Sequence, residues 1–156
     1  MNDIATPGLD HVTDLRADVS APPIDIGATP HGFRKIIPIV GGSVSGPRLN
    51  GKLMPGGADY QYWRSDGCTE LHARYVISTD SGARVYVESN GLRRGPPEAM
   101  AKLMRGEPVD PALIYFRTTV RFETAAPELA WLMQSQFICA GARFPDRVVI
   151  RFFEVT

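Results

Sequence analysis

The chain has 156 residues, of which 44% are hydrophobic, and its 17 lysines and arginines balance its 17 aspartates and glutamates. A chain of this length needs one hydrophobic core, and balanced charge provides no global field that would attract nucleic acid or an anionic membrane. The longest apolar runs, residues 36–40 and 125–133, are interrupted by proline or charge, so neither can cross a bilayer as a helix.

The N-terminal segment favours a cytoplasmic location as the default, and the two cysteines argue against a zinc ribbon or a thioredoxin-like redox motif. The chain begins with early acidic residues and has no basic start before an apolar block, which is not the pattern of a secretory signal. Cys68 and Cys139 form no Cys-x-x-Cys motif. Because free cysteine packs as a small hydrophobe, both are predicted to be reduced, buried thiols.

Residues 1–13 are predicted to form a loose leader before a single domain over residues 14–156. Within 14–19, apolar and charged residues alternate with the period of a half-buried strand. A proline pair ends this strand. A loop then leads to an apolar strand at 36–40, whose internal proline indicates an edge position or a bulge.

A glycine-dense stretch follows, with glycines at positions 41, 42, 46, 51, 56 and 57. Glycine at this density marks tight turns, bulges and places where the backbone passes close to another segment. We expect three strands in this region, at residues 42–45, 49–54 and 59–64.

The longest alternating segment, residues 68–79, predicts a strand with two different faces. One face carries Leu71, Ala73, Tyr75 and Ile77, and the other carries Glu70, His72, Arg74 and Val76. A turn signal at 80–82 and renewed alternation over 83–90 complete a hairpin.

The period changes to that of a short amphipathic helix at about 97–105, which begins with two prolines and ends before Gly106. Strand alternation returns over 112–124, and residues 131–140 and 147–155 supply the last two strands. Many strands in hairpin order with one inserted helix exclude alternating β-α-β units. They favour a mainly β fold, either a sandwich or a barrel. A single antiparallel β-barrel is preferred because closure removes exposed strand edges.

Four sequence blocks resemble those of the DUF3237 (UPF0311) family of uncharacterised proteins: HGFRKIIPIVGGSVSGPRLNGKLMPGGADY, LHARYVISTDSG, YFRTTVRFET and ELAWL, in this order. The most specific piece is the glycine and proline spacing between Gly41 and Asp59. The resemblance implies an antiparallel barrel, similar in kind to lipocalin-like and allene-oxide-cyclase-like barrels, and no established activity. This chain departs from the family pattern at His72, where members commonly carry an acid, and at Met133, where they commonly carry Asn.

Asp59 is the candidate catalytic residue, a general base, because two preceding glycines let the backbone come close to a ligand. The alternative is a turn cap that accepts hydrogen bonds from local N–H groups. Arg74 and Arg117 lie in the middle of predicted strands, and if both point inward with Asp59 they form a polar, anion-binding floor. Alternatively, the two arginines face outward or form structural ion pairs.

Three more residues are candidate ligand contacts. His72 shares a strand face with Arg74 and is a candidate proton shuttle, although a lone histidine on a strand is commonly just exposed. Tyr86 and Tyr115 can donate a hydroxyl to a ligand or pack across strands. The sequence has no histidine cluster, Walker loop, nucleophile elbow or dinucleotide fingerprint, so we expect no metal and no cofactor.

Three functions remain open from the sequence. The first is binding of a small organic acid or ketone-like metabolite in the barrel interior. The second is an isomerase or cyclase in which Asp59 transfers a proton and Arg74 or Arg117 stabilises an oxyanion. The third is an interaction module in which exposed strands or the Trp131 region form a homodimer.

Overall fold

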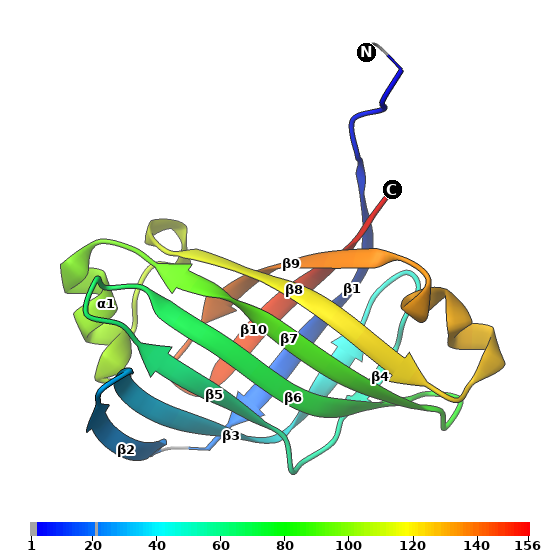
Figure 1. Ribbon diagram of the computed structural model, residues 1–156. Helices are drawn as coiled ribbons and strands as arrows, with labels where there is room; N and C mark the ends of the chain where they lie inside the picture. Colours follow the sequence, from blue (N-terminus) through cyan, green and yellow to red (C-terminus); the bar gives the residue numbers. More distant parts are fainter. Residues whose placement is uncertain (1–2, 21) are drawn as a thin grey trace.

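Antiparallel strands wrap around one interior and close into a barrel (Figure 1). This computed structural model describes residues 3–20 and 22–156. β1 (Leu9–Val19) pairs along one side with β10 (Arg147–Val155) and along the other with β3 (Gly32–Ser45), and these pairings close the circle. The barrel has eight strand positions, and the predicted fold class, a mainly β antiparallel barrel, is confirmed.

The remaining elements follow one another mostly as hairpin neighbours. They are β2 (Ile24–Thr29), β4 (Gly51–Leu53), β5 (Ala58–Trp63), β6 (Thr69–Thr79), β7 (Arg84–Arg94), α1 (Pro97–Met104), η1 (Pro111–Leu113), β8 (Tyr115–Thr124), η2 (Pro127–Met133) and β9 (Gln136–Arg143). β4 and β5 share one strand position, since both lie between β3 and β6. β2 pairs with the first half of β3, outside the closed circle.

β3 is one long bent strand where the sequence predicts two short ones. Its first half pairs with β5 and its second half with β1 and β4, so the strand changes neighbours near Pro38. The Pro38 carbonyl accepts the Ser20 N–H at 3.1 Å, and no proline N–H is needed there because the pairing with β1 begins at Ile39. Gly42 has a φ of 151°, and a Cβ at this position would lie 1.9 Å from the Arg16 carbonyl oxygen. Glycine therefore lets β3 pass close to β1.

Three predicted boundaries are wrong. β1 begins at Leu9, inside the predicted leader of residues 1–13, and the sequence hides this because the first residues of the strand are exposed and show no apolar alternation. Residues 24–29 are expected as a loop but form β2, where a register shift accommodates the internal glycine. Residues 131–133, expected as the start of a strand, belong to the 3₁₀ helix η2, which has Pro127 in its first turn.

The half of the interior near η2, called the solid half, is filled by side chains. Its members are Val12, Val44, Leu53, Ile77, Val85, Val87, Phe122, Leu132, Phe137 and Phe152. The rings of Phe122 and Phe137 meet edge to face with centroids 5.0 Å apart, a favourable aromatic geometry. Leu132 of η2 is 1% exposed and packs into this core.

α1 lies at the opposite end of the barrel (Figure 1) and confirms the helix predicted at about 97–105. Its buried side consists of Ala99, Met100 and Leu103. Gly106, with a φ of 76°, follows its last turn. None of the helices in the described ranges is long and apolar enough to cross a membrane.

Candidate functional site

Strand alternation aims polar side chains into a cavity of about 50 Å³ in the half of the barrel near α1, called the inner cavity. Its polar lining consists of Asp59, Gln61, Ser89, Arg93, Thr118 and Arg143. The other lining residues are apolar or aromatic, and small ones such as Ala17 and Ala73 leave the space open. A cavity of this volume has room for a few water molecules or for a small part of an organic ligand.

Asp59 faces the inner cavity at the end of a chain of hydrogen bonds. Trp63 Nε1 donates to Gln61 Oε1 at 3.0 Å, and Gln61 Nε2 donates to Asp59 Oδ2 at 2.7 Å. Because the indole nitrogen is only a donor, it fixes the orientation of the Gln61 amide. The backbone N–H of His72 donates to Asp59 Oδ1 at 2.9 Å. Both carboxyl oxygens are therefore oriented, and the second contact joins β5 to β6 rather than capping a local turn.

Burial raises the pKa of the Asp59 carboxyl above its ordinary value of 3.8. The hydrogen bond from Gln61, the charge of Arg93 and the His72 N–H oppose this rise. Asp59 consequently takes up a proton at a higher pH than an exposed aspartate does, which suits a general base or a carboxyl that shares a proton with a ligand.

Arg93, near the end of β7, is a buried cation of the cavity lining. It is 2% exposed, and its Nε has no hydrogen-bond partner among the residues that the structure describes. Asp59 attracts it electrostatically. The rings of Trp63 and Phe116 lie beside its guanidinium, with centroids 5.1 and 5.7 Å from Cζ. Burial lowers the pKa of Arg93 to about 10, so the side chain is still positively charged at neutral pH.

The sequence-based prediction misses Arg93 because the predicted strand ends at residue 90. The alternation that begins with Val85 and Val87 continues at Ser89 and at every second residue to the end of β7. Extending this period places Arg93 on the inner face, so the signal is present in the sequence.

Arg143, at the end of β9, is a second cation that the sequence-based prediction misses. Its Nη1 donates to the carbonyl oxygens of Phe144 and Arg147. Burial lowers its pKa, and the charges of Asp146 and Asp59 oppose this change. With Arg93 and Arg143 against one carboxylate, the lining of the inner cavity carries more positive than negative groups.

A larger space of about 520 Å³, called the mouth chamber, lies beside the inner cavity at the α1 end. The two spaces share Ile37, Gln61, Arg93 and Arg143. The rest of the mouth chamber includes Lys35, Trp63 and the last turn of α1. Because the two spaces share these residues, the mouth chamber leads from the barrel end to the inner cavity.

The arginines predicted to form an anion-binding floor with Asp59 point away from it. Arg74 lies on the outer face of β6, where it donates to Asn90 Oδ1 at 3.1 Å and lies 3.6 Å from Glu88. Arg117 lies on the outer face of β8 and donates to the preceding carbonyl oxygen at 2.9 Å. Strand alternation is the reason, because the residues next to each arginine line the cavity. The inward arrangement is therefore wrong, and the outward alternative describes both side chains.

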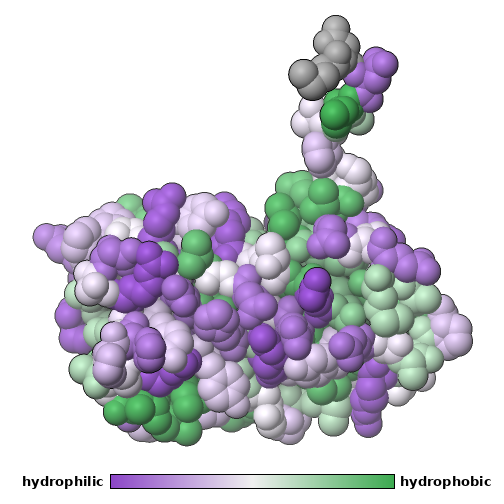
Figure 2. Space-filling model, in the orientation of Figure 1, coloured by the Kyte–Doolittle hydropathy of each residue, from purple (hydrophilic) through white to green (hydrophobic). Residues whose placement is uncertain are grey.

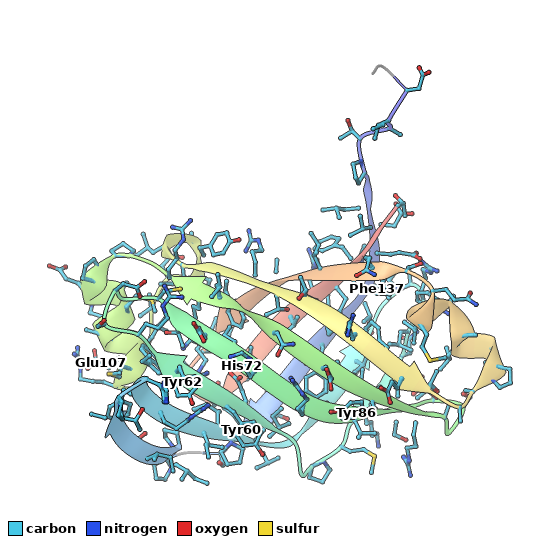
Figure 3. All side chains as sticks on the ribbon, in the orientation of Figure 1. Tyr60, Tyr62, His72, Tyr86, Glu107 and Phe137 are labelled. Atoms are coloured by element: carbon cyan, nitrogen blue, oxygen red, sulfur yellow. The ribbon has the colours of Figure 1, made fainter. Side chains whose placement is uncertain are left out.

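The other candidate contacts also lie outside the inner cavity. Figure 2 shows hydrophilic side chains over the face formed by β5–β8, and Figure 3 labels His72 and Tyr86 on it. His72 Nδ1 lies 3.2 Å from Asn90 Oδ1, and the Tyr86 hydroxyl donates to Glu88 at 3.3 Å. Tyr115 is 42% exposed. Of these residues, His72 reaches the site through its main-chain N–H.

The cysteines and the acidic residues do not indicate a second site, either a reactive thiol or a metal site. Cys139 is buried, and burial raises the pKa of its thiol to about 12, so it is not a nucleophile at neutral pH. Cys68 is free and only partly buried. Within residues 3–20 and 22–156, no group of three or more His, Cys, Asp and Glu side chains could hold a metal ion.

Comparison with known proteins finds relatives over nearly the whole chain. The family model described as "Protein of unknown function (DUF3237)" matches residues 7–155. A UPF0311 protein of Rhodopseudomonas palustris (strain TIE-1) is 55% identical over 124 residues, which cover 80% of this chain and 81% of that protein. A UPF0311 protein of Clostridium acetobutylicum is 46% identical over 125 residues, which cover 80% of this chain and 79% of that protein.

Solved structures share the barrel. A conserved protein of unknown function from Rhodopseudomonas palustris has a TM-score of 0.91 at 45% identity, covering 98% of this chain and 99% of that chain. A β-barrel-like protein from Acinetobacter baumannii AYE has a TM-score of 0.87 at 32% identity, covering 100% of both chains. An enzyme from Penicillium herquei has a TM-score of 0.71 at 17% identity, covering 100% of both chains, and this similarity shows the fold alone. The resemblance found in the sequence blocks is confirmed.

Proposed function

This chain belongs to the DUF3237 family of proteins of unknown function, and we propose that it binds a small organic anion or carbonyl compound in its inner cavity. The observation that supports this most strongly is Arg93, whose buried Nε lacks a partner in the described part of the chain. A carboxylate or carbonyl oxygen is the kind of acceptor that a guanidinium binds well.

The unpaired Nε of Arg93 has an energetic cost that a ligand oxygen would remove. A buried donor without an acceptor costs about 1–3 kcal/mol, and more when the group is charged. Native proteins leave few such groups, so each one calls for an explanation. A ligand oxygen beside Arg93 would replace the lost hydration, while the apolar walls of the inner cavity would cover the carbon atoms of the ligand.

Asp59 adds a second polar contact whose protonation depends on the ligand. An ionised carboxylate repels an anion, whereas a protonated carboxyl donates a hydrogen bond to it. Burial already raises the pKa of Asp59, and a nearby bound anion raises it further. We therefore expect proton uptake when an acid anion binds and none when a neutral carbonyl compound binds. Calorimetric titrations in two buffers of different ionisation enthalpy measure this difference.

The direct test is a thermal-shift screen of small carboxylic acids and carbonyl compounds, followed by calorimetric titration of the compounds that stabilise the protein. Arg93→Met is expected to weaken binding at least about tenfold, the effect of losing one charged hydrogen bond. Arg94→Met removes a neighbouring arginine that is exposed, and should leave the affinity unchanged. Equal affinities in the wild type and in Arg93→Met would contradict the proposal.

A second candidate function is proton transfer of the isomerase or cyclase type. One observation favours it: Asp59, with both oxygens oriented, faces the same cavity as Arg93. In this role Asp59 takes a proton from a carbon beside the carbonyl of the ligand. The electron pair of the broken C–H bond forms the C=C bond of an enolate, and the π pair of the carbonyl moves to its oxygen, which Arg93 stabilises. In a ligand with a second C=C bond conjugated to this enolate, Asp59 then returns the proton to the far carbon of the conjugated system.

Hydrogen exchange in D₂O, followed by NMR on a carbonyl compound that binds, separates the two functions. Asp59→Asn is expected to abolish exchange while leaving affinity nearly intact, and Arg93→Met is expected to lower both. Exchange at the wild-type rate in Asp59→Asn eliminates the base. Absence of exchange in the wild type with every bound carbonyl compound leaves binding as the function.

A further inference from the structure

The mouth chamber is rich in positive charge. Its ionisable lining residues are Asp25, Lys35, Arg93, Arg105 and Arg143. Arg105 is already engaged in an ion pair with Glu107 at 2.6 Å, and Arg143 donates to main-chain carbonyl oxygens. Lys35 and Arg93 are the cations of this lining that remain for a ligand.

Lys35 has hydrogen-bonding capacity to spare. It is 6% exposed, and its Nζ donates to the Met104 carbonyl oxygen at the end of α1 at 2.8 Å. Asp25 Oδ1 lies 3.6 Å from Nζ and forms an ion pair with it, but this distance is beyond that of an ordinary hydrogen bond, so Asp25 offsets part of the charge without occupying a donor. Because an ammonium group has three donors, Lys35 can bind a ligand acceptor and keep its bond to α1.

Lys35 and Arg93 lie beside the same aromatic ring. Lys35 Nζ is 5.8 Å from the centroid of the Trp63 ring, and Arg93 Cζ is 5.1 Å from it. Lys35 Nζ and Arg93 Cζ are therefore no farther apart than the sum of these two distances. A short apolar spacer that crosses the ring can join an acceptor at one cation to an acceptor at the other, and the ring offers this spacer an apolar surface.

From this geometry we infer that the ligand is a dianion, a short molecule with an acid group at each end. One acid group binds at Arg93, on the boundary of the inner cavity, and the other binds at Lys35 in the mouth chamber. The spacer lies on Trp63. This inference rests on the proposed function and narrows it, since a monoacid satisfies Arg93 alone, whereas a dicarboxylate satisfies both cations.

The experiment compares acids that differ by one carboxylate. Glutarate, adipate, pimelate and homophthalate are titrated by calorimetry against pentanoate, hexanoate, heptanoate and phenylacetate. The ionic strength is held constant because salt screens charge interactions. At least one diacid should bind about tenfold more tightly than its matched monoacid, as expected for one added charged hydrogen bond.

The outcomes separate this inference from the function on which it rests. If the diacids bind no more tightly than the monoacids, the inference that the ligand is a dianion is wrong, whereas the proposal that the cavity binds an anion stands. If no acid of either kind binds, the inference of a dianionic ligand is also wrong. Binding of the carbonyl compounds in the screen then tests the proposed function.

Variants of Lys35 test its role directly. Lys35→Met should reduce the affinity for the diacid to that for the monoacid and leave the monoacid unchanged, whereas Lys35→Arg should retain the preference. Lys52→Met removes an exposed lysine of β4 and controls for net charge, so it should change neither affinity. If Lys35→Met weakens monoacid binding equally, Lys35 acts only by holding α1 in place, and the second subsite is overturned.

Discussion

One strand pattern builds the whole barrel interior, yet its two halves are filled differently. In the solid half the inward positions carry large apolar side chains, and Phe152, Ile77 and Val85 have no exposed surface. In the half near α1, called the hollow half and defined by the lining of the inner cavity, inward positions include small residues such as Ala73 and charged ones such as Asp59. The small residues leave the space, and the charged residues face it.

With the proposed function, stability and ligand binding would belong to opposite ends of the molecule. The solid half removes apolar surface from water, at about 25 cal/mol per Å². The hollow half gives up part of that packing and keeps Arg93 buried with an incomplete set of partners, which lowers stability. Departures from good packing and full hydrogen bonding of this kind are expected where a site requires them.

The largest effect is expected from a truncation in the solid half. Phe152→Ala removes a ring that is 0% exposed and should lower the free energy of unfolding by about 3–5 kcal/mol, since transfer and cavity terms add. Phe153→Ala on the outer face of the same strand is the matched control, because that side chain is only partly buried. Urea unfolding measures both, and equal losses would contradict the division of the interior.

A substitution in the hollow half is expected to raise the free energy of unfolding rather than lower it. Arg93→Met in an Asp59→Asn background replaces a buried charge by an apolar side chain of similar length without leaving the Asp59 carboxylate unpaired, and should raise the free energy of unfolding by about 1–3 kcal/mol in the absence of ligand. Arg94→Met, at the exposed neighbouring position, should stay within about 0.5 kcal/mol of the wild type. A loss of stability when Arg93→Met is added to Asp59→Asn would identify the arginine as a structural group and remove the main support for a binding site.

Enlarging a buried side chain should change stability with opposite signs in the two halves. Ala73→Val places two methyl groups toward the inner cavity, and should stabilise the protein by about 0.5–2 kcal/mol while weakening ligand binding. Val85→Ile adds one methylene where the side chain is 0% exposed, and should destabilise by about 1–3 kcal/mol through overpacking. Thermal melts of both variants suffice, and a destabilised Ala73→Val would show that the hollow half has no usable space.

The barrel could be predicted from the sequence because strand alternation is a local signal. The pattern of residues 68–79 assigns Leu71, Ala73 and Tyr75 to one face, and these three side chains line the inner cavity. β2 could not be predicted in this way. It lies outside the closed circle and buries no face, and its alternation covers only residues 24–26 before Gly27, which is too short to predict a strand.

The site could be predicted only in part. Asp59 stands out because glycines precede it, and it does face the cavity. The same alternation that assigns Ala73 inward excludes Arg74 from the interior. To predict that Arg93 faces the cavity, the strand that begins near residue 83 has to be extended past residue 90. The burial of Lys35 depends on contact with α1, a segment remote in the chain, and no local pattern reports such a contact.

The smallest expected effect is the pH dependence of stability, and it has opposite signs inside and outside the barrel. Burial raises the pKa of Asp59 above 3.8, so between its unfolded and folded pKa values the folded protein binds more protons than the unfolded chain. The contribution of Asp59 is therefore complete below its unfolded pKa and is lost as pH rises through its folded pKa. Asp14, outside the barrel, accepts hydrogen bonds from Arg151 at 2.8 and 2.9 Å, which lower its pKa. Its contribution is complete above the unfolded pKa and is lost as pH falls through the folded pKa.

Asp59→Asn and Asp14→Asn should consequently diverge when urea unfolding is repeated from acidic to neutral pH. The stability of the wild type relative to Asp59→Asn falls as pH rises, because the ionised carboxylate is held in a poorly hydrated site. The stability relative to Asp14→Asn rises, by no more than about 1 kcal/mol for an exposed pair. The Asp59 effect is also limited, since the Gln61 amide and the charge of Arg93 favour the ionised form. If both differences rise with pH, Arg93 and Gln61 satisfy Asp59 as fully as Arg151 satisfies Asp14. The polar groups of the hollow half would then form a complete ion-pair network with no free capacity to bind a ligand.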